Sequence, residues 1–178
     1  MTHGAYHPIT QCKLTASLDD NGDVTAMRIR ISGQSILAGV MPQRLSNGAD
    51  MVTFQCMLPK GEHGISYSFP NLLVDHAMRN THVPPGFWRG VNINQNAIFI
   101  ECFMDELAEA AGQDPVEFRR KFMAKYPRNL AALNAVARAA DGRGSETGLT
   151  DRLLKRLGIA TATELIPALV SGNASRQQ

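Results

Sequence analysis

Polar and apolar residues alternate in the first third of the chain, as they do in β-strands with one buried face. Over residues 24–32, Met27, Ile29 and Ile31 alternate with arginines, so one side of this strand is expected to be dry and the other wet. A second strand is expected over residues 12–18. The sequence DDNGD between them contains residues that tolerate a positive φ, which predicts a β-hairpin.

The pattern then becomes less regular. Residues 33–63 contain repeated glycines and prolines, and they predict irregular structure with room for one short helix. The sequences GISYSF (64–69) and LLVDHAMRN (72–80) predict two further strands, and the second of these leads to the pair Pro84-Pro85.

A helical period begins at Ala97. The apolar positions that share one helix face are Ile100, Phe103, Met104, Leu107 and Ala111. Acidic residues occupy the opposite face, and Gly112 suits the end of the helix. Because strands come first and helices follow, the chain is predicted to be an α+β protein. An antiparallel or mixed sheet from the N-terminal half is expected to pack against C-terminal helices.

Two further helices are predicted before the tail. Asp114 and Pro115 are a typical N-cap and first helical residue. The next helix is expected over residues 129–140, with Asn129 as its cap. After a break at residues 142–148, the tail contains two short segments, 150–158 and 161–172, that also predict helices.

Composition indicates an ordinary globular protein. The chain has 178 residues, of which 44% are hydrophobic and 19% charged. A net charge of +2 is too small to indicate a nucleic-acid partner or an anionic membrane. No apolar run has the ~20 residues that span a bilayer, and no secretory signal is recognised. A cytoplasmic protein is the default expectation, and export of the full enzyme together with a partner stays open. Three widely spaced cysteines indicate buried free thiols in a reducing compartment.

Several candidate sites have a simpler structural explanation. His3 and His7 have the spacing of a helical metal site, but the glycine and proline beside them disfavour a helix. Cys102 follows a glutamate without a histidine at a useful spacing, so a packed thiol is expected. The acidic residues of the long helix lack an E-x-x-H pairing and predict a solvated face; they are Glu101, Asp105, Glu106 and Glu109. The basic residues of the tail are also expected to be solvated; they are Arg152, Lys155 and Arg156.

The segment before the long helix has a more specific composition. Trp88 is the only tryptophan, and it stands with Arg89 and Gly90 after a rigid proline pair. Asn92, Asn94, Gln95 and Asn96 follow at once. Such a loop at a helix N-terminus can present N–H groups to a polar or anionic ligand. It can equally be a structural loop whose tryptophan fills the core, and composition favours neither.

The sequence from Phe87 to Arg120 resembles the large subunit of molybdenum hydroxylases, the family of xanthine dehydrogenase and aldehyde oxidoreductase. That family has an aromatic residue, then Arg-Gly-Phe-Gly-Gly-Pro-Gln, then a helix with Glu-Cys or Glu-Ser and a later Asp-Pro. GQSILAG (33–39) and VPPGFWRGV (83–91) look like the branch of the isoquinoline 1-oxidoreductase β-subunit. The resemblance extends over residues 4 to 140.

The resemblance implies roles for individual residues. Trp88, Arg89, Gly90 and Gln95 match the segment that approaches the molybdenum–pterin cofactor, with backbone contacts rather than a salt bridge, and are its expected binding residues. Val91 stands where xanthine dehydrogenase has a phenylalanine that stacks on the substrate, so it is expected to line the substrate pocket. No metal ligand is assigned.

The chain also departs from the family pattern. It lacks the catalytic glutamate, which the family carries in a Gly-x-Gly-Glu context, and an upstream glycine-rich loop. No catalytic residue is therefore assigned. Residues 1–140 are expected to be one cofactor-binding lobe, and residues 141–178 a helical tail outside the family pattern.

The resemblance implies an oxidoreductase that hydroxylates N-heteroaromatic rings or aldehydes with oxygen from water. The expected cofactor is molybdopterin in its cytosine dinucleotide form. The expected partners are the rest of the large subunit and an iron–sulfur small subunit, without nucleic acid or a membrane span. This lobe alone is expected to be inactive and to hold no cofactor. The alternative is a non-catalytic binding or assembly module that docks a partner through the tail.

Overall fold

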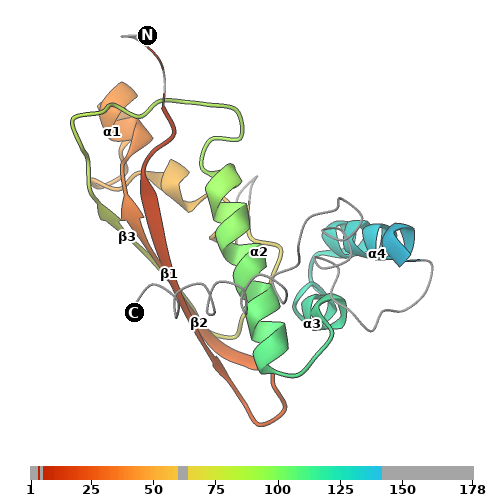
Figure 1. Ribbon diagram of the computed structural model, residues 1–178. Helices are drawn as coiled ribbons and strands as arrows, with labels where there is room; N and C mark the ends of the chain where they lie inside the picture. Colours follow the sequence, from red (N-terminus) through yellow and green to blue (C-terminus); the bar gives the residue numbers. More distant parts are fainter. Residues whose placement is uncertain (1–3, 5, 60–63, 142–178) are drawn as a thin grey trace, which may run out of the picture.

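The computed structural model describes residues 4, 6–59 and 64–141 (Figure 1). The elements follow one another as β1 (Thr10–Leu18), β2 (Val24–Gly33), α1 (Ile36–Val40), the 3-10 helices η1 (Pro42–Arg44) and η2 (Met51–Phe54), β3 (Leu72–Met78), α2 (Ile93–Ala110), α3 (Pro115–Phe122) and α4 (Pro127–Asp141). The predicted tail helices lie outside the described residues. The α+β class is confirmed.

The sheet is mixed and has the order β1-β2-β3. β1 and β2 form the predicted antiparallel hairpin, in which Cys12 lies opposite Ile31. β3 runs parallel to β2, with Val74 opposite Ile29. In the hairpin turn, the carboxylate of Asp19 accepts hydrogen bonds from the backbone N–H groups of Asn21 and Asp23, both at 2.9 Å.

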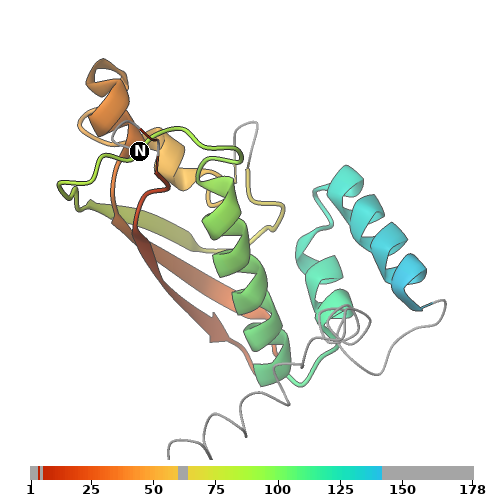
Figure 2. The ribbon, with the colours of Figure 1, turned by 45° about the horizontal axis from the view of Figure 1, so that its top comes forward.

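The two faces of β2 differ as its alternation predicts. Ile29 and Ile31 are fully buried, and α2 lies across this face of the sheet (Figure 2). On the other face Arg30 forms two hydrogen bonds with Asp75 of β3, at 2.7 and 2.9 Å, and Arg28 pairs with the same carboxylate. The hydrogen bond from Arg30 lowers the pKa of Asp75. Burial of the apolar face provides the main driving force for this layer.

The stripe predicted for the long helix is confirmed, but its start is not. Ile100, Met104 and Leu107 are buried against the sheet, and Phe103 and Ala111 pack at the margin. α2 begins at Ile93, four residues before the predicted start at Ala97. Asn92 is the N-cap residue of α2, and Asn94, Gln95 and Asn96 lie in its first turn.

Residues 64–69 do not form the predicted strand. Ile65 and Tyr67 are buried, which explains their alternating pattern. However, the N–H group of Ile65 donates to Leu58 and that of Ser68 to Phe122, at the end of α3. The segment therefore packs as an extended strap against helices and loops, because its backbone groups find partners there and not in the sheet.

The cap predicted for α3 is present, whereas the cap predicted for α4 is not. The carboxylate of Asp114 accepts hydrogen bonds from the N–H groups of Val116 and Glu117, as predicted for the start of α3. α4 begins at Pro127, so Asn129 lies inside the helix and is not its cap. The amide of Asn129 donates to the hydroxyl of Ser66 at 2.6 Å. No helix in the described part of the chain has the length and apolar character needed to cross a membrane.

Candidate functional site

The loop that carries Trp88 connects β3 to α2 and is held at its entry by contacts with the N-terminal segment. The N–H group of Gly86 donates to the carbonyl of Tyr6 at 3.0 Å. The buried amide of Gln34 donates to the carbonyl of Val83 at 2.7 Å and to the hydroxyl of Thr81 at 2.9 Å. These contacts fix where the loop leaves the sheet.

The loop itself is a tight turn from Trp88 to Val91. The carbonyl of Trp88 accepts a hydrogen bond from the N–H group of Val91 at 2.7 Å. Gly90 has φ +79°, so the turn has the hydrogen bond and third-position glycine of a type II turn. Val91 has φ +49°, which is unusual for a β-branched residue and stores backbone strain. Strain of this kind clusters at functional sites.

Gly90 is required by its neighbours as well as by its φ. A Cβ atom at this position would lie 2.0 Å from Oδ1 of Asn94. The amide of Asn94 donates to the carbonyl of Arg89 at 2.7 Å, so the side chain of Asn94 closes the turn across the glycine.

The hydrogen bonds of the turn leave its donors unused. The carbonyls of Trp88, Arg89 and Gly90 accept from Val91, Asn94 and Ile93, respectively. Among the described residues, none of the N–H groups of Trp88, Arg89 and Gly90 donates a hydrogen bond. They lie next to the N-terminus of α2, where the helix dipole favours negative charge. This donor set fits a ligand with anionic or oxo groups, such as a pterin cofactor with phosphates.

The side chains of the turn lie on the surface. Trp88 is 50% exposed, so the interpretation of this residue as a core plug is wrong. The guanidinium carbon of Arg89 lies 5.6 Å from the centre of the Trp88 ring, and the ring of His7 lies 6.3 Å from it. Arg89 pairs with no carboxylate in the described part of the chain. The site thus presents an aromatic face and a cation beside the free N–H groups.

The carboxamides behind the turn anchor α2. The buried amide of Asn96 donates to the carbonyls of Thr53 and Gln55, at 2.9 and 2.7 Å. Buried Asn92 donates to the carbonyl of Val52 at 3.1 Å. The amide of Gln95 donates to Oδ1 of Asn92 at 2.6 Å, and its carbonyl oxygen accepts no hydrogen bond from the described residues. Asn92 and Asn96 are one helical turn apart, which is why both reach η2.

A buried aspartate that the sequence did not single out organises the segment that receives these asparagines. Asp50 is fully buried. Its carboxylate accepts from the hydroxyl of Ser35 at 2.7 Å and from the N–H groups of Leu37 and Val52, at 3.0 and 2.8 Å. It caps η2 and ties α1 to it. An aspartate directly before an apolar run is a capping signal, which could have identified it.

The acidic face of α2 is not simply solvated, contrary to the prediction. Arg119 of α3 has a side chain only 9% exposed, and it donates to Glu101 at 3.0 Å and Asp105 at 2.6 Å. The hydroxyl of Tyr67 donates to Glu101 at 2.8 Å. Burial and the charge of Glu101 raise the pKa of Tyr67. Burial, the largest single effect, lowers the pKa of Arg119, but its hydrogen bond to Asp105 and the neighbouring negative charges of Asp105 and Glu101 act with Tyr67 to raise the pKa overall. The cluster joins α3 to α2 and is structural.

Metal and thiol chemistry find little support among the described residues. No group of three or more metal-ligating side chains is found in them, and His3 lies outside them. Cys102 is exposed and Cys12 and Cys56 are half-buried, so the prediction of packed, buried thiols is wrong for Cys102. Burial raises the pKa of Cys12 to about 11, which keeps this thiol protonated at neutral pH.

Comparison with known proteins identifies the family of this chain. The family model described as a molybdopterin cofactor-binding domain matches residues 1–123. Isoquinoline 1-oxidoreductase subunit beta of Brevundimonas diminuta is 26% identical over 133 residues, which are 73% of this chain and 16% of that protein. The aldehyde oxidoreductase of Desulfovibrio gigas has a similar fold, with a TM-score of 0.52 at 20% identity over 80% of this chain and 17% of that one. The chain therefore spans about a sixth of the length of either protein.

Proposed function

The chain belongs to the molybdopterin cofactor-binding domain family, and from this premise we propose that it is one lobe of the large subunit of a molybdenum hydroxylase. The observation that carries the proposal is the turn from Trp88 to Gly90, whose carbonyls are all hydrogen-bonded and whose N–H groups donate to no residue that the structure describes. The family match supports a molybdopterin cofactor, and this donor set supports its placement at the turn.

In this proposal the backbone holds the cofactor. The N–H groups of Trp88, Arg89 and Gly90 donate to oxo or phosphate oxygens, because those are the acceptors that an array of free N–H groups binds. The guanidinium of Arg89, held over the Trp88 ring, adds positive charge near the cofactor without forming a salt bridge to it. The carbonyl oxygen of Gln95 accepts from N–H groups of the pterin.

The bound molybdenum–pterin group supplies the redox chemistry, and the protein supplies binding and orientation. We propose that the assembled enzyme hydroxylates a carbon of an N-heteroaromatic ring or an aldehyde, with oxygen from water. Val91, half-buried at the end of the turn, borders the substrate pocket and contributes shape without ring stacking. The cofactor is proposed to be the cytosine dinucleotide form, and an iron–sulfur subunit to accept the electrons.

This lobe supplies none of the proton transfers. The catalytic glutamate of the family and its glycine-rich loop belong to other segments, so the lobe needs the rest of the large subunit for activity. The proposal therefore assigns to this chain the positioning of the cofactor through the turn and, through Asn92 and Asn96, the orientation of α2 beneath it.

A chimera tests the proposal. Residues 4–140 of this chain replace the matching segment of the Brevundimonas diminuta subunit, which is produced with its partner subunit. Molybdenum is measured by elemental analysis and pterin by fluorescence after oxidative release. The chimera is expected to retain both, and the separate chain neither. A folded chimera without molybdenum, or a separate chain that holds stoichiometric molybdenum, would contradict the proposal.

A further inference from the structure

The buried polar residues gather around the loop that carries the turn. In the part of the chain that the structure describes, seven polar or charged residues are buried. One is Arg119, and the other six lie at the end of this loop or in the segments that hold it: Gln34, Ser35, Asp50, Thr53, Asn92 and Asn96. A buried polar group lowers stability unless it is hydrogen-bonded, whereas a connected network of such groups specifies one arrangement. This distribution indicates that the position of the loop matters.

The end of β2 holds the entry of the loop. The amide of Gln34 donates to the carbonyl of Val83 at 2.7 Å. The N–H group of Ser35, the next residue, donates to Oδ1 of Asn80 at 2.9 Å. The hydroxyl of Ser35 in turn donates to the carboxylate of Asp50 at 2.7 Å. The entry of the loop is therefore joined to Asp50 through a single residue.

The same aspartate holds the exit of the loop through η2. Its other oxygen accepts from the N–H group of Val52 at 2.8 Å and caps η2, a single 3-10 turn that needs such a partner. The carbonyl of Val52 accepts from the side chain of Asn92 at 3.1 Å. Gln55, the residue after η2, accepts from the N–H group of Asn92 through Oε1 at 3.2 Å and from the side chain of Asn96 through its carbonyl at 2.7 Å. Asp50 thus lies between the two ends of the loop.

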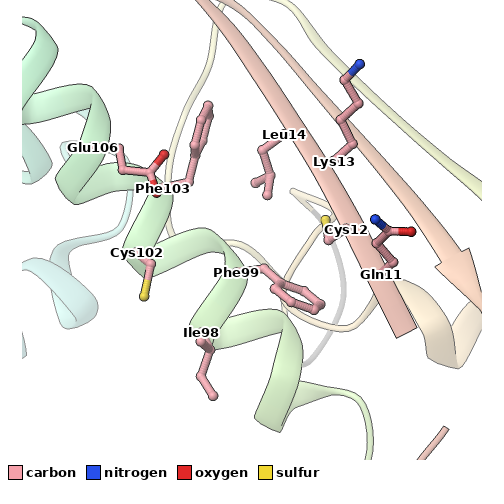
Figure 3. A pocket seen from close by; sticks show the side chains of 9 residues that line it. All are labelled: Gln11, Cys12, Lys13, Leu14, Ile98, Phe99, Cys102, Phe103 and Glu106. Carbon is pink, nitrogen blue, oxygen red and sulfur yellow. The ribbon is translucent and has the colours of Figure 1, made fainter. Parts of the chain in front are cut away.

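The rest of α2 is held to the sheet by apolar contacts. Figure 3 shows Phe99 and Phe103 extending from α2 toward β1, where Leu14 and Cys12 lie. A groove of about 480 Å³ remains between β1 and α2, so the packing on this side is incomplete. Because hydrophobic contact is not directional, it keeps the helix on the sheet without fixing the position of its first turn. The hydrogen bonds to η2 and Gln55 fix that turn.

We infer that Asp50 is a positioning residue for the cofactor: by joining Ser35 to η2, it fixes both ends of the loop and hence the spacing of the N–H groups from Trp88 to Gly90. This role rests on the proposed function. Because Asp50 is fully buried, it acts through the backbone of η2 and not by contact with the cofactor. Donors that are already in place bind a ligand without the cost of ordering them.

Hydrogen exchange in the full chain without cofactor tests this coupling. Asp50→Asn keeps an oxygen for the N–H group of Val52, because asparagine caps as well as aspartate, but it places an amide against the N–H group of Leu37. The N–H group of Val91, which closes the turn, is expected to exchange about tenfold faster, as for the loss of one hydrogen bond. The N–H group of Ile29, in the central strand β2, measures the change in global stability.

Arg119→Met is the matched control. It removes hydrogen bonds that reach α2 at Glu101 and Asp105, more than two turns beyond Asn92. Exchange is expected to become faster at Ile29 and to stay unchanged at Val91. The same pattern in Asp50→Asn would show a merely structural role for Asp50 and would overturn the inference.

A milder variant covers the case in which Asp50→Asn does not fold. Ser35→Ala removes one donor from Asp50 and leaves the N–H groups of Leu37 and Val52 in place. Faster exchange at Val91, by about threefold, is expected without a comparable change at Ile29. Unchanged exchange at Val91 would overturn the inference here as well.

Cofactor content separates this role from the proposed function. In the chimera described above, molybdenum and pterin per folded protein are expected to fall about tenfold for Asp50→Asn and to stay near the parent level for Arg119→Met. A parent chimera without molybdenum would contradict the proposed function, and with it a role in holding the cofactor. A loaded parent whose Asp50→Asn variant holds as much molybdenum as its Arg119→Met variant would overturn the role of Asp50 alone.

Discussion

At the scale of single residues, the turn before α2 depends on one glycine. Gly90 combines φ +79° with a side-chain neighbour 2.0 Å from the place of a Cβ atom. A glycine in such a turn can let a ligand approach the backbone closely. The structure adds that Asn94 already occupies the space, so the glycine is needed for the turn even before any ligand binds.

Gly90→Ala is expected to destabilise the chain by about 1–2 kcal/mol, through a left-handed alanine and the lost hydrogen bond of Asn94. Gly48→Ala is the matched control, because Gly48 has φ +78° and open space around it. Chemical denaturation of both variants gives the free energies of unfolding. Equal losses would show that the contact with Asn94 is unimportant.

The thiols should differ in reactivity. Exposed Cys102 is expected to react first with a maleimide, and Cys12 last, because burial raises the pKa of Cys12 to about 11. A raised pKa means that the unfolded state releases this proton at lower pH than the folded state. The contribution of Cys12 to stability is therefore present below pH 9, the ordinary pKa of a cysteine, and is lost as the pH rises toward 11. Mass spectrometry of partly labelled protein measures the order in which the thiols react. Faster labelling of Cys12 than of Cys102 would contradict this prediction.

At the scale of elements, tertiary contacts decide where the helices and strands begin and end. The periodicity of hydrophobic residues predicted β1, β2, β3 and the buried stripe of α2, because burial of one face of a strand or helix imposes that periodicity directly. It failed for residues 64–69, where alternation comes from packing against α3, and for the first turn of α2, where Asn92 and Asn96 are buried by hydrogen bonds to η2. These hydrogen-bond partners are about 40 residues away in the sequence, so the local pattern of residues does not reveal them.

The docking of α3 depends on Arg119. Arg119→Met is expected to lower the free energy of unfolding by on the order of 2 kcal/mol, because it leaves Glu101 and Asp105 without their shared cation. The solvent exposure of Glu101 keeps the loss from being larger. Lys121→Met is the control on the same helix. Its ion pair with Asp23 is exposed on both sides, so about 0.5 kcal/mol or less is expected. Thermal melting distinguishes the two, and equal melting temperatures would contradict the structural role of the cluster.

At the scale of the whole molecule, the chain is a small part of a larger architecture. The matches cover 16% and 17% of the two relatives. The family was recognisable from the sequence because its motif lies in one continuous segment, from Trp88 to Pro115, and the fold class because strands precede helices. The free N–H groups of the turn were not visible in the sequence, since they depend on which carbonyls accept bonds from Val91, Asn94 and Ile93.

The central claim is that the backbone of this turn holds the cofactor, and a proline tests it most directly. Position 89 is the second residue of a type II turn, where proline is favoured. Arg89→Pro therefore removes one N–H group and keeps the turn, whereas Arg89→Ala removes the guanidinium and keeps the N–H group. In the chimeric enzyme, molybdenum and pterin content per folded protein are expected to fall about tenfold for Arg89→Pro, the loss of one charge-assisted hydrogen bond. They should fall much less for Arg89→Ala, which loses the charge of a guanidinium that makes no direct bond to the cofactor in this account. Equal cofactor content in both variants would contradict the account.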